Sequence, residues 1–185
     1  MKQLILASQS PRRAKILEEN GVQFTIVKTD SEETSYPEDP EKTVRENAVL
    51  KLSACRKIHT QASILAADTI VWFNDEIYGK PRDLNEARLM LRKLSGNTHT
   101  VFTGVAFTDG ESQEVKTSVC RSEVTFHALK DESINEYVER TRPTDRAGAY
   151  DIDENGDMLV ARYEGEYENI MGLPINPLRD WGIIR

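Results

Sequence analysis

The chain has 185 residues, of which 38% are hydrophobic and 30% are charged, and its formal net charge is −7. This length and composition are typical of one folded domain with a buried core, here spanning residues 1–185, and they exclude a disordered chain. The excess of acidic residues also argues against a general nucleic-acid-binding protein, because such a protein needs basic residues to neutralise backbone phosphates.

The sequence carries no membrane signal. No apolar run approaches the roughly 20 residues that a membrane span requires, and the apolar core of the N-terminal segment is too short for a signal peptide. Cys55 and Cys120 lie far apart and match no metal-ligand spacing, so both are expected to be reduced thiols. We therefore predict a cytoplasmic protein that has no membrane partner and binds no nucleic acid stably.

Hydrophobic periodicity predicts helices and strands that alternate in the first half of the chain and hairpins in the second. The predicted strands are residues 3–8, 22–28, 63–73, 99–109 and 115–127, and the predicted helices are residues 11–20, 41–58, 84–95 and 131–140, with a further helix at the C-terminus. This succession predicts an α/β fold with a mixed sheet.

Turn signals refine this prediction. Asn74-Asp75 is expected to form a hairpin turn, and Asp109-Gly110 and Glu164-Gly165 are expected to form two more. Asp68 and Thr69 are polar residues in the middle of the apolar strand 63–73, and we expect them to break it.

Residues 6–13, Leu-Ala-Ser-Gln-Ser-Pro-Arg-Arg, join the first predicted strand to the first predicted helix. Ser10 is suited to the N-cap and Pro11 to the first helical position. Arg12 and Arg13 then oppose the helix dipole unless an anion lies between them, bound by the free N–H groups of the helix and by the two guanidinium groups. The segment therefore predicts a phosphate-binding site that includes Ser8, although two solvated arginines remain the alternative.

Four further charged residues are candidates for the same site. Asp68 follows an apolar run, where an unpaired carboxylate is costly, so it either caps a turn or serves as a general base or metal ligand. Lys80, between Gly79 and Pro81, could reach phosphate oxygens. Lys51 interrupts an apolar helix face and either snorkels to solvent or points at an anion. Glu33 lies in an acidic loop and could recruit Mg²⁺ beside a phosphate site.

Other catalytic patterns are absent from the sequence. It contains no Gly-x-x-x-x-Gly-Lys-Ser/Thr segment, which excludes a P-loop enzyme. His59, His99 and His127 are scattered, and none pairs with a plausible nucleophile or matches a zinc site.

With these motifs in order, the chain resembles the Maf family of nucleotide pyrophosphatases, also described as septum-formation inhibitor homologues. The resemblance covers essentially the full length. It rests on Leu-Ala-Ser-Gln-Ser-Pro-Arg-Arg at 6–13, Ala-Ala-Asp-Thr at 66–69, Gly-Lys-Pro at 79–81, Leu-Ser-Gly at 94–96, Thr-Gly-Val at 103–105, Asp-Arg-Ala-Gly-Ala-Tyr at 145–150 and Gly-Leu-Pro at 172–174. It implies a twisted mixed sheet flanked by helices, with a cleft between two lobes as in Maf and ITPase-like folds.

The resemblance also implies an activity. A nucleoside triphosphate would be hydrolysed at the α–β linkage, giving the monophosphate and pyrophosphate, with a divalent cation, normally Mg²⁺ and alternatively Mn²⁺. Asp68 would accept the proton of the attacking water. The residues that match those holding the triphosphate are Ser8, Arg12, Arg13, Lys51 and Lys80. Glu33 and Asp68 would hold the metal, and the protein would be a homodimer.

Base preference depends on three positions. In the dTTP/UTP-preferring branch of the family, Arg12, Thr69 and a glutamine after Ala-Gly-Ala-Tyr mark specificity, but this chain has Asp153 at the glutamine position. A carboxylate only accepts hydrogen bonds, whereas an amide also donates them to a base carbonyl. The motifs favour dTTP and UTP as substrates. The alternatives are hydrolysis of 7-methyl-GTP or of another modified nucleotide, and a non-catalytic role as a nucleotide-binding regulator of septum formation.

Overall fold

The computed structural model describes residues 3–112 and 114–185, and their strands form a seven-stranded sheet. The strands are β1 (Leu4–Leu6), β2 (Phe24–Ile26), β3 (Ser63–Phe73), β4 (Glu76–Tyr78), β5 (Thr98–Thr108), β6 (Lys116–Phe126) and β7 (Val160–Glu164). Their order in the sheet is β2-β1-β3-β5-β6-β7, with β4 paired to β3. The β2-β1-β3 part is parallel and the β3-β5-β6-β7 part is antiparallel, so the sheet is mixed, as predicted.

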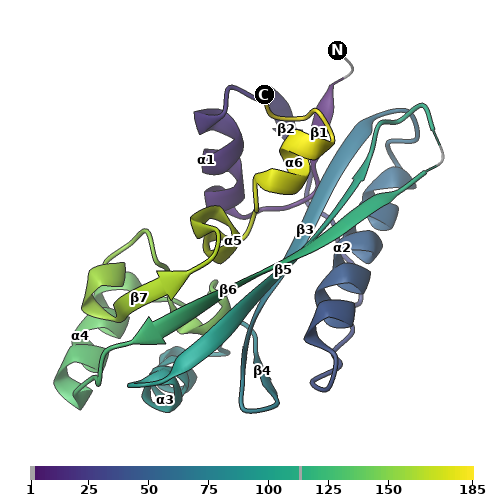
Figure 1. Cartoon of the computed structure of the whole chain (residues 1–185). Coiled ribbons are helices and arrows are strands. Elements are labelled where there is room, and N and C mark those ends of the chain that lie inside the picture. The colour runs from purple at the N-terminus through teal and green to yellow at the C-terminus, as the bar shows by residue number, and fades with distance from the viewer. Residues whose placement is uncertain (1–2, 113) are drawn as a thin grey trace.

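Helices cover both faces of this sheet (Figure 1). They are α1 (Pro11–Glu19), α2 (Pro40–Arg56), α3 (Leu84–Leu94), α4 (Asp131–Thr141), α5 (Tyr167–Met171) and α6 (Asn176–Asp180), and two short 3₁₀ turns lie at Ala147–Ala149 and Gly156–Met158. Helix α2 lies on one face, whereas α1, α5 and α6 lie on the other (Figure 1). None of the helices in the described part of the chain is long and apolar enough to cross a membrane.

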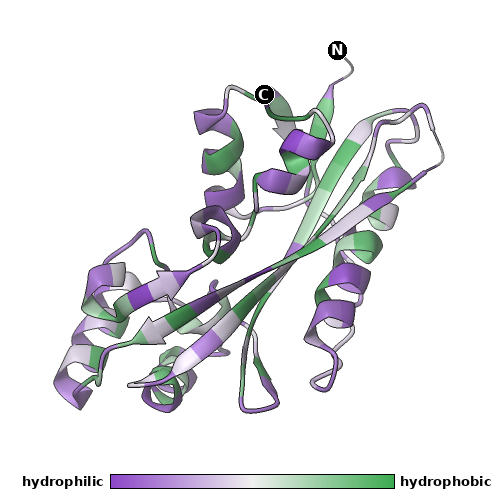
Figure 2. Ribbon diagram, in the orientation of Figure 1, coloured by the Kyte–Doolittle hydropathy of each residue, from purple (hydrophilic) through white to green (hydrophobic). Residues whose placement is uncertain are grey.

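The first half of β3 is buried on both faces. Ile64 and Ala66 pack against α2, and Leu65 and Ala67 pack in the core formed with α1, α5 and α6. Successive side chains of a strand point to opposite faces. The sequence of a strand that is covered on both faces is therefore a continuous run of apolar residues. Figure 2 shows this run as hydrophobic colouring along β1 and the first half of β3.

A second core lies at the other end of the long strands. There α3 and α4 pack through Leu91, Leu94 and Tyr137 against the sheet, where they meet Val101 of β5 and Val124 of β6 among other residues. The two cores form two lobes on one continuous sheet, and the α/β prediction with a cleft between lobes is confirmed.

Most predicted element boundaries agree with the structure. The Asn74-Asp75 turn is confirmed, and the φ angles of 50° and 58° place both residues in the left-handed region that a tight hairpin turn requires. Ser10 precedes α1 as predicted, but its side chain makes no capping hydrogen bond.

Three predictions about the strands were wrong or incomplete. Strand β3 is not broken at Asp68 and Thr69, because both residues remain in register with β5. The predicted hairpin around Glu164 and Gly165 does not form, since β7 pairs with β6 and α5 follows directly. The chain does turn between β5 and β6 at Asp109, but through a longer loop than the predicted turn. The Asp109 carboxylate accepts from the backbone N–H groups of Glu111 and Ser112, and β6 begins only at Lys116.

Candidate active site

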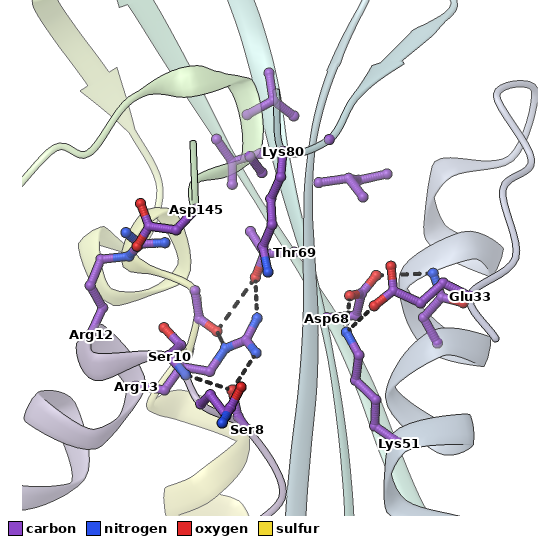
Figure 3. Close-up of a pocket in the computed structure, with 18 of the residues that line it drawn as sticks. Ser8, Ser10, Arg12, Arg13, Glu33, Lys51, Asp68, Thr69, Lys80 and Asp145 are labelled. Carbon is purple, nitrogen blue, oxygen red and sulfur yellow. Dashed lines mark hydrogen bonds and ion pairs between the residues drawn. The ribbon is translucent and has the colours of Figure 1, made fainter. Parts of the chain in front are cut away.

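A cavity of about 860 Å³ opens between the two lobes, along the middle of β3. Its walls come from the start of α1, the loop before α2, α2 itself, the end of β4 and the segments around residues 145–151 and 170–172. The residues singled out from the sequence that line it are Ser8, Arg12, Arg13, Glu33, Lys51, Asp68, Thr69 and Lys80. Figure 3 shows Lys80 pointing into this space from the rim opposite Ser8.

Arg13 is held from three directions at the base of the cavity. Its Nη1 donates to Ser8 Oγ at 3.0 Å, its Nη2 donates to Thr69 Oγ1 at 3.0 Å, and its Nε donates to the carbonyl oxygen of Gly172 at 2.7 Å (Figure 3). Thr69 Oγ1 in turn lies 3.0 Å from Thr103 Oγ1 on β5. These bonds use three of the five N–H groups of the guanidinium, which leaves two for an anion.

The charge of Arg13 is retained in this setting. Burial lowers its pKa to about 10, and the opposing charge of Asp68 limits the decrease. A pKa near 10 still leaves the guanidinium protonated at neutral pH. Arg13 therefore offers a positive charge, fixed in place by three hydrogen bonds, in a half-buried part of the cavity, where an anion interacts with it more strongly than in open solvent.

Arg12 has a different environment from Arg13. Its Nη1 lies 3.2 Å from Oδ2 of Asp151, a buried carboxylate whose Oδ1 accepts from the backbone N–H of Asp153. The hydroxyl of Tyr137 accepts from the backbone N–H of Asp151 at 2.9 Å. Two arginines in the first turn of a helix are expected to have an anion nearby, and for Arg12 this anion is the Asp151 carboxylate.

The structure does not bring Asp153 into the cavity. Its carboxylate forms an ion pair with Lys15 on the outer side of α1, and the hydroxyl of Tyr167 donates to it at 3.4 Å. The hydrogen bond with Asp153 raises the pKa of Lys15, as expected for an exposed ion pair. At this end of the cavity the lining carboxylates are those of Asp145 and Asp151.

Asp68 lines the same cavity as Arg13, on the other side of β3 (Figure 3), and is almost fully buried. Its Oδ1 accepts from Lys51 Nζ, and its Oδ2 accepts from Asn47 Nδ2 at 3.1 Å. Lys51 Nζ also contacts Glu33 Oε1 at 2.9 Å, so one ammonium group bridges two carboxylates (Figure 3). A buried carboxylate is tolerated when it is paired and hydrogen-bonded, which explains why a charged residue occupies the middle of β3.

The same two carboxylates are the candidate metal ligands. Within the described residues, no group of three or more His, Cys, Asp or Glu side chains is close enough to hold a metal ion. Mg²⁺, however, is commonly bound by one or two carboxylates together with substrate phosphates and water. Glu33 and Asp68 fit that donor set, although Lys51 Nζ lies between them in this structure.

Sequence reasoning missed two side chains of the site. Asn47 precedes Lys51 by one helical turn and shares its helix face, a spacing that was available from the sequence. Asp151 follows directly on the 145–150 motif but gave no local signal, since its partner Arg12 is 139 positions away.

Comparison with known proteins agrees with the motif analysis. The family model described as Maf-like protein matches residues 3–181. A dTTP/UTP pyrophosphatase of Dictyoglomus thermophilum is 42% identical over 176 residues, which cover 94% of this chain and 91% of that protein. The dTTP/UTP pyrophosphatases of Bacillus mycoides and Thermotoga maritima are 44% and 41% identical, covering 95% and 93% of this chain and 91% and 84% of theirs.

Among solved structures, the Staphylococcus aureus Ham1 protein aligns with a TM-score of 0.48 and 17% identity, over 70% of this chain and 74% of that one.

Proposed function

This chain belongs to the Maf-like protein family, and on that premise we propose that it is a nucleoside triphosphate pyrophosphatase. Its substrates are dTTP and UTP, and its products are the nucleoside monophosphate and pyrophosphate. The observation that carries the proposal is that one cavity holds both a half-buried cationic site, centred on Arg13, and a buried carboxylate, Asp68. The names of the relatives support the choice of substrate.

The cationic side of the cavity would hold the triphosphate. Arg13 offers its two remaining N–H groups, Ser8 lies beside it, and Lys80 approaches from the opposite rim. Phosphoanhydride hydrolysis places negative charge on the leaving pyrophosphate, and positioned cations that stabilise this charge lower the barrier. Arg12 contributes less charge to this binding, because Asp151 already neutralises part of it.

Asp68 would act on the attacking water. Water attacks the α-phosphorus, the bond to the bridging oxygen breaks, and pyrophosphate leaves with the electron pair of that bond. Lys51 and Asn47 each take one lone pair of the Asp68 carboxylate, which leaves further lone pairs to accept a hydrogen bond from water. Asp68 therefore orients the water and accepts its proton as a general base.

We also propose that Glu33 and Asp68 hold a divalent cation, Mg²⁺ or alternatively Mn²⁺, together with substrate oxygens. When bound, such an ion supplies charge neutralisation on the phosphate oxygens. Lys51 must then leave its position between the two carboxylates, and the triphosphate offers it a new anionic partner. Lys51 lines the cavity that would hold the triphosphate, which supports this exchange.

A second substrate, 7-methyl-GTP, has one observation in its favour. The Asp151 carboxylate lines the cavity and only accepts hydrogen bonds. A guanine base presents its 2-amino group as a donor beside its ring N–H, whereas uracil and thymine present only the N3–H donor. The relatives nevertheless favour dTTP and UTP.

Cytoplasmic location and a homodimeric state complete the proposal. Both remain predictions: the first comes from the sequence and the second from the family resemblance.

Pyrophosphate release measured with dTTP, UTP, 7-methyl-GTP and the standard nucleotides, each with Mg²⁺, tests the proposal. We expect the highest kcat/KM with dTTP or UTP. Micromolar binding without release from any nucleotide would instead identify a non-catalytic nucleotide-binding regulator. Preferred release from 7-methyl-GTP would retain the enzyme class but change the substrate.

A further inference from the structure

Asn47 is a polar residue on the face of α2 that packs against the sheet, and only 2% of its surface is exposed. Its amide connects two separate parts of the candidate site. One is Thr34, next to Glu33 in the loop before α2, and the other is Asp68 in β3.

The hydrogen bonds of Asn47 saturate its amide. Oδ1 accepts from the backbone N–H of Thr34 at 2.7 Å and from its hydroxyl at 3.1 Å, while Nδ2 donates to the Thr34 carbonyl oxygen at 3.0 Å and to Asp68 Oδ2 at 3.1 Å. An amide has two donor hydrogens and two acceptor lone pairs, so none is left for solvent. The orientation of the amide is also fixed, because the Thr34 N–H can only donate and the Asp68 carboxylate only accepts.

Asn47 and Lys51 together hold both oxygens of one carboxylate. They are four residues apart on α2 and therefore lie on the same helix face, one turn apart. Lys51 contacts Oδ1 of Asp68 and Asn47 contacts Oδ2 (Figure 3 shows the Lys51 contact). Two donors from one rigid helix prevent the carboxylate from rotating about its terminal bond, which is otherwise a soft torsion.

The two donors differ in what they can do during a reaction. Lys51 lies at the cavity wall and also contacts Glu33, so it can exchange its carboxylate partners for phosphate oxygens. Asn47 is saturated and buried, so its bond to Asp68 persists when Lys51 moves. Its bonds to Thr34 hold the backbone next to Glu33 at the same time.

From this arrangement we infer that Asn47 is a positioning residue for the proposed hydrolysis. It fixes the orientation of the Asp68 carboxylate and, through Thr34, the position of the loop that carries Glu33, so one side chain sets the spacing of the two carboxylates. The inference rests on the proposed function, because it assigns Asn47 to the reaction in which Asp68 is the base.

Two substitutions affect the two connections to different extents. Asn47→Asp retains an oxygen that accepts from the Thr34 N–H and hydroxyl, but it removes the Nδ2 donor to the Thr34 carbonyl oxygen and to Asp68, and in mildly alkaline buffer it places a second negative charge beside Asp68. Asn47→Ala removes both connections. Asn135→Asp is the matched control, since Asn135 lies on the exposed surface of α4 and accepts there from Arg88 Nε, which an aspartate also permits.

The measurements are kcat and KM for dTTP with Mg²⁺, and hydrogen exchange of the Thr34 amide. We expect kcat to fall on the order of 10- to 100-fold in both Asn47 variants while KM stays within about threefold, because a misplaced base weakens the reaction step and not substrate binding. The Thr34 amide should stay protected in Asn47→Asp and exchange at least about tenfold faster in Asn47→Ala.

Other outcomes overturn the inference. If kcat of Asn47→Asp is within about twofold of the Asn135→Asp control, Asn47 has no positioning role. If kcat of Asn47→Asp falls and the Thr34 amide also loses its protection from hydrogen exchange, the role of Asn47 is purely structural. If Asn47→Asp does not fold, Asn47→Ala decides, since a raised KM with unchanged kcat contradicts positioning. A wild-type protein without turnover on any nucleotide refutes the proposed function itself, which is a distinguishable result.

Discussion

Asp68 lies directly opposite Gly104 in the antiparallel register of β3 and β5. Helix α2 crosses the sheet at this point, and a Cβ atom built on Gly104 would lie 2.3 Å from the carbonyl oxygen of Val44. The absence of a side chain at Gly104 therefore allows the backbone of α2 to approach the sheet closely. This approach brings Asn47 and Lys51 within hydrogen-bonding distance of Asp68.

Gly104→Ala should consequently destabilise the fold, because the added methyl group meets backbone atoms that cannot rotate away. We expect the free energy of unfolding to fall by about 1–3 kcal/mol or more, as in overpacked cores, measured by urea denaturation. Gly79→Ala is the matched control: Gly79 has open space around its Cβ position and an ordinary φ, so its unfolding free energy should barely change. Equal effects of the two substitutions would contradict the packing argument.

Arg13→Lys retains the positive charge but loses the forked geometry that joins Ser8, Thr69 and the Gly172 carbonyl. A lysine ammonium is a point charge and cannot reproduce three divergent hydrogen bonds. We expect KM for dTTP to rise about tenfold or more, since charge-assisted hydrogen bonds contribute about 1.5–3 kcal/mol each. Steady-state kinetics measure this effect, and an unchanged KM would mean that Arg13 does not bind the triphosphate.

Asp151→Asn and Asp153→Asn make the same chemical change inside and outside the cavity. An amide at 151 can donate to a uracil carbonyl and presents one acceptor oxygen fewer to the ring N–H and 2-amino donors of 7-methylguanine, so the ratio of kcat/KM for UTP to that for 7-methyl-GTP should rise about tenfold or more. The ratio should stay within about twofold in Asp153→Asn. A shift in Asp153→Asn alone would assign base recognition to Asp153, as the sequence motif suggested.

His99 should contribute a distinct pH dependence to stability. It is buried against Tyr150 and Phe126, and burial lowers its pKa to about 3. Below about pH 6.5 the unfolded chain binds a proton at this residue while the folded chain does not, so the free energy of unfolding falls with decreasing pH, by about 1.4 kcal/mol per pH unit from this residue.

His99→Gln removes the titrating group and retains a polar partner for Tyr150. The stability difference between wild type and variant should therefore shrink as pH decreases from about 6.5 towards 3. Urea denaturation at several pH values measures it. Parallel stability curves for the two proteins would show that His99 is not held neutral in the folded state.

The sequence predicted most of the fold because its local signals are strong. Apolar periodicity located the helices, and Asn74-Asp75 located its turn. The predicted break at Asp68 was wrong because the partners that stabilise a carboxylate there come from α2, which local sequence does not reveal. The hairpin at Glu164-Gly165 was wrong because β7 pairs with a strand that precedes it in the chain.

The candidate site was predicted to a similar extent. The 6–13 segment and Asp68 could be located because each stands out from its neighbours, and the structure brings them to one cavity. Asn47 and Asp151 could not be assigned, since their roles depend on contacts with residues 21 and 139 positions away. Asp153 was placed by motif comparison, and an offset of two residues along this loop separates the cavity-lining carboxylate of Asp151 from the surface carboxylate of Asp153.

The proposed role of Asp68 is to drive cleavage between the α- and β-phosphates. Phosphorus-31 NMR of dTTP with Mg²⁺ and either wild type or Asp68→Asn tests this role most directly. The wild type should produce dTMP and pyrophosphate, while Asp68→Asn should bind dTTP within about threefold of wild type and turn over at least about 100-fold more slowly. Formation of dTDP and orthophosphate, or undiminished turnover by Asp68→Asn, would contradict the claim.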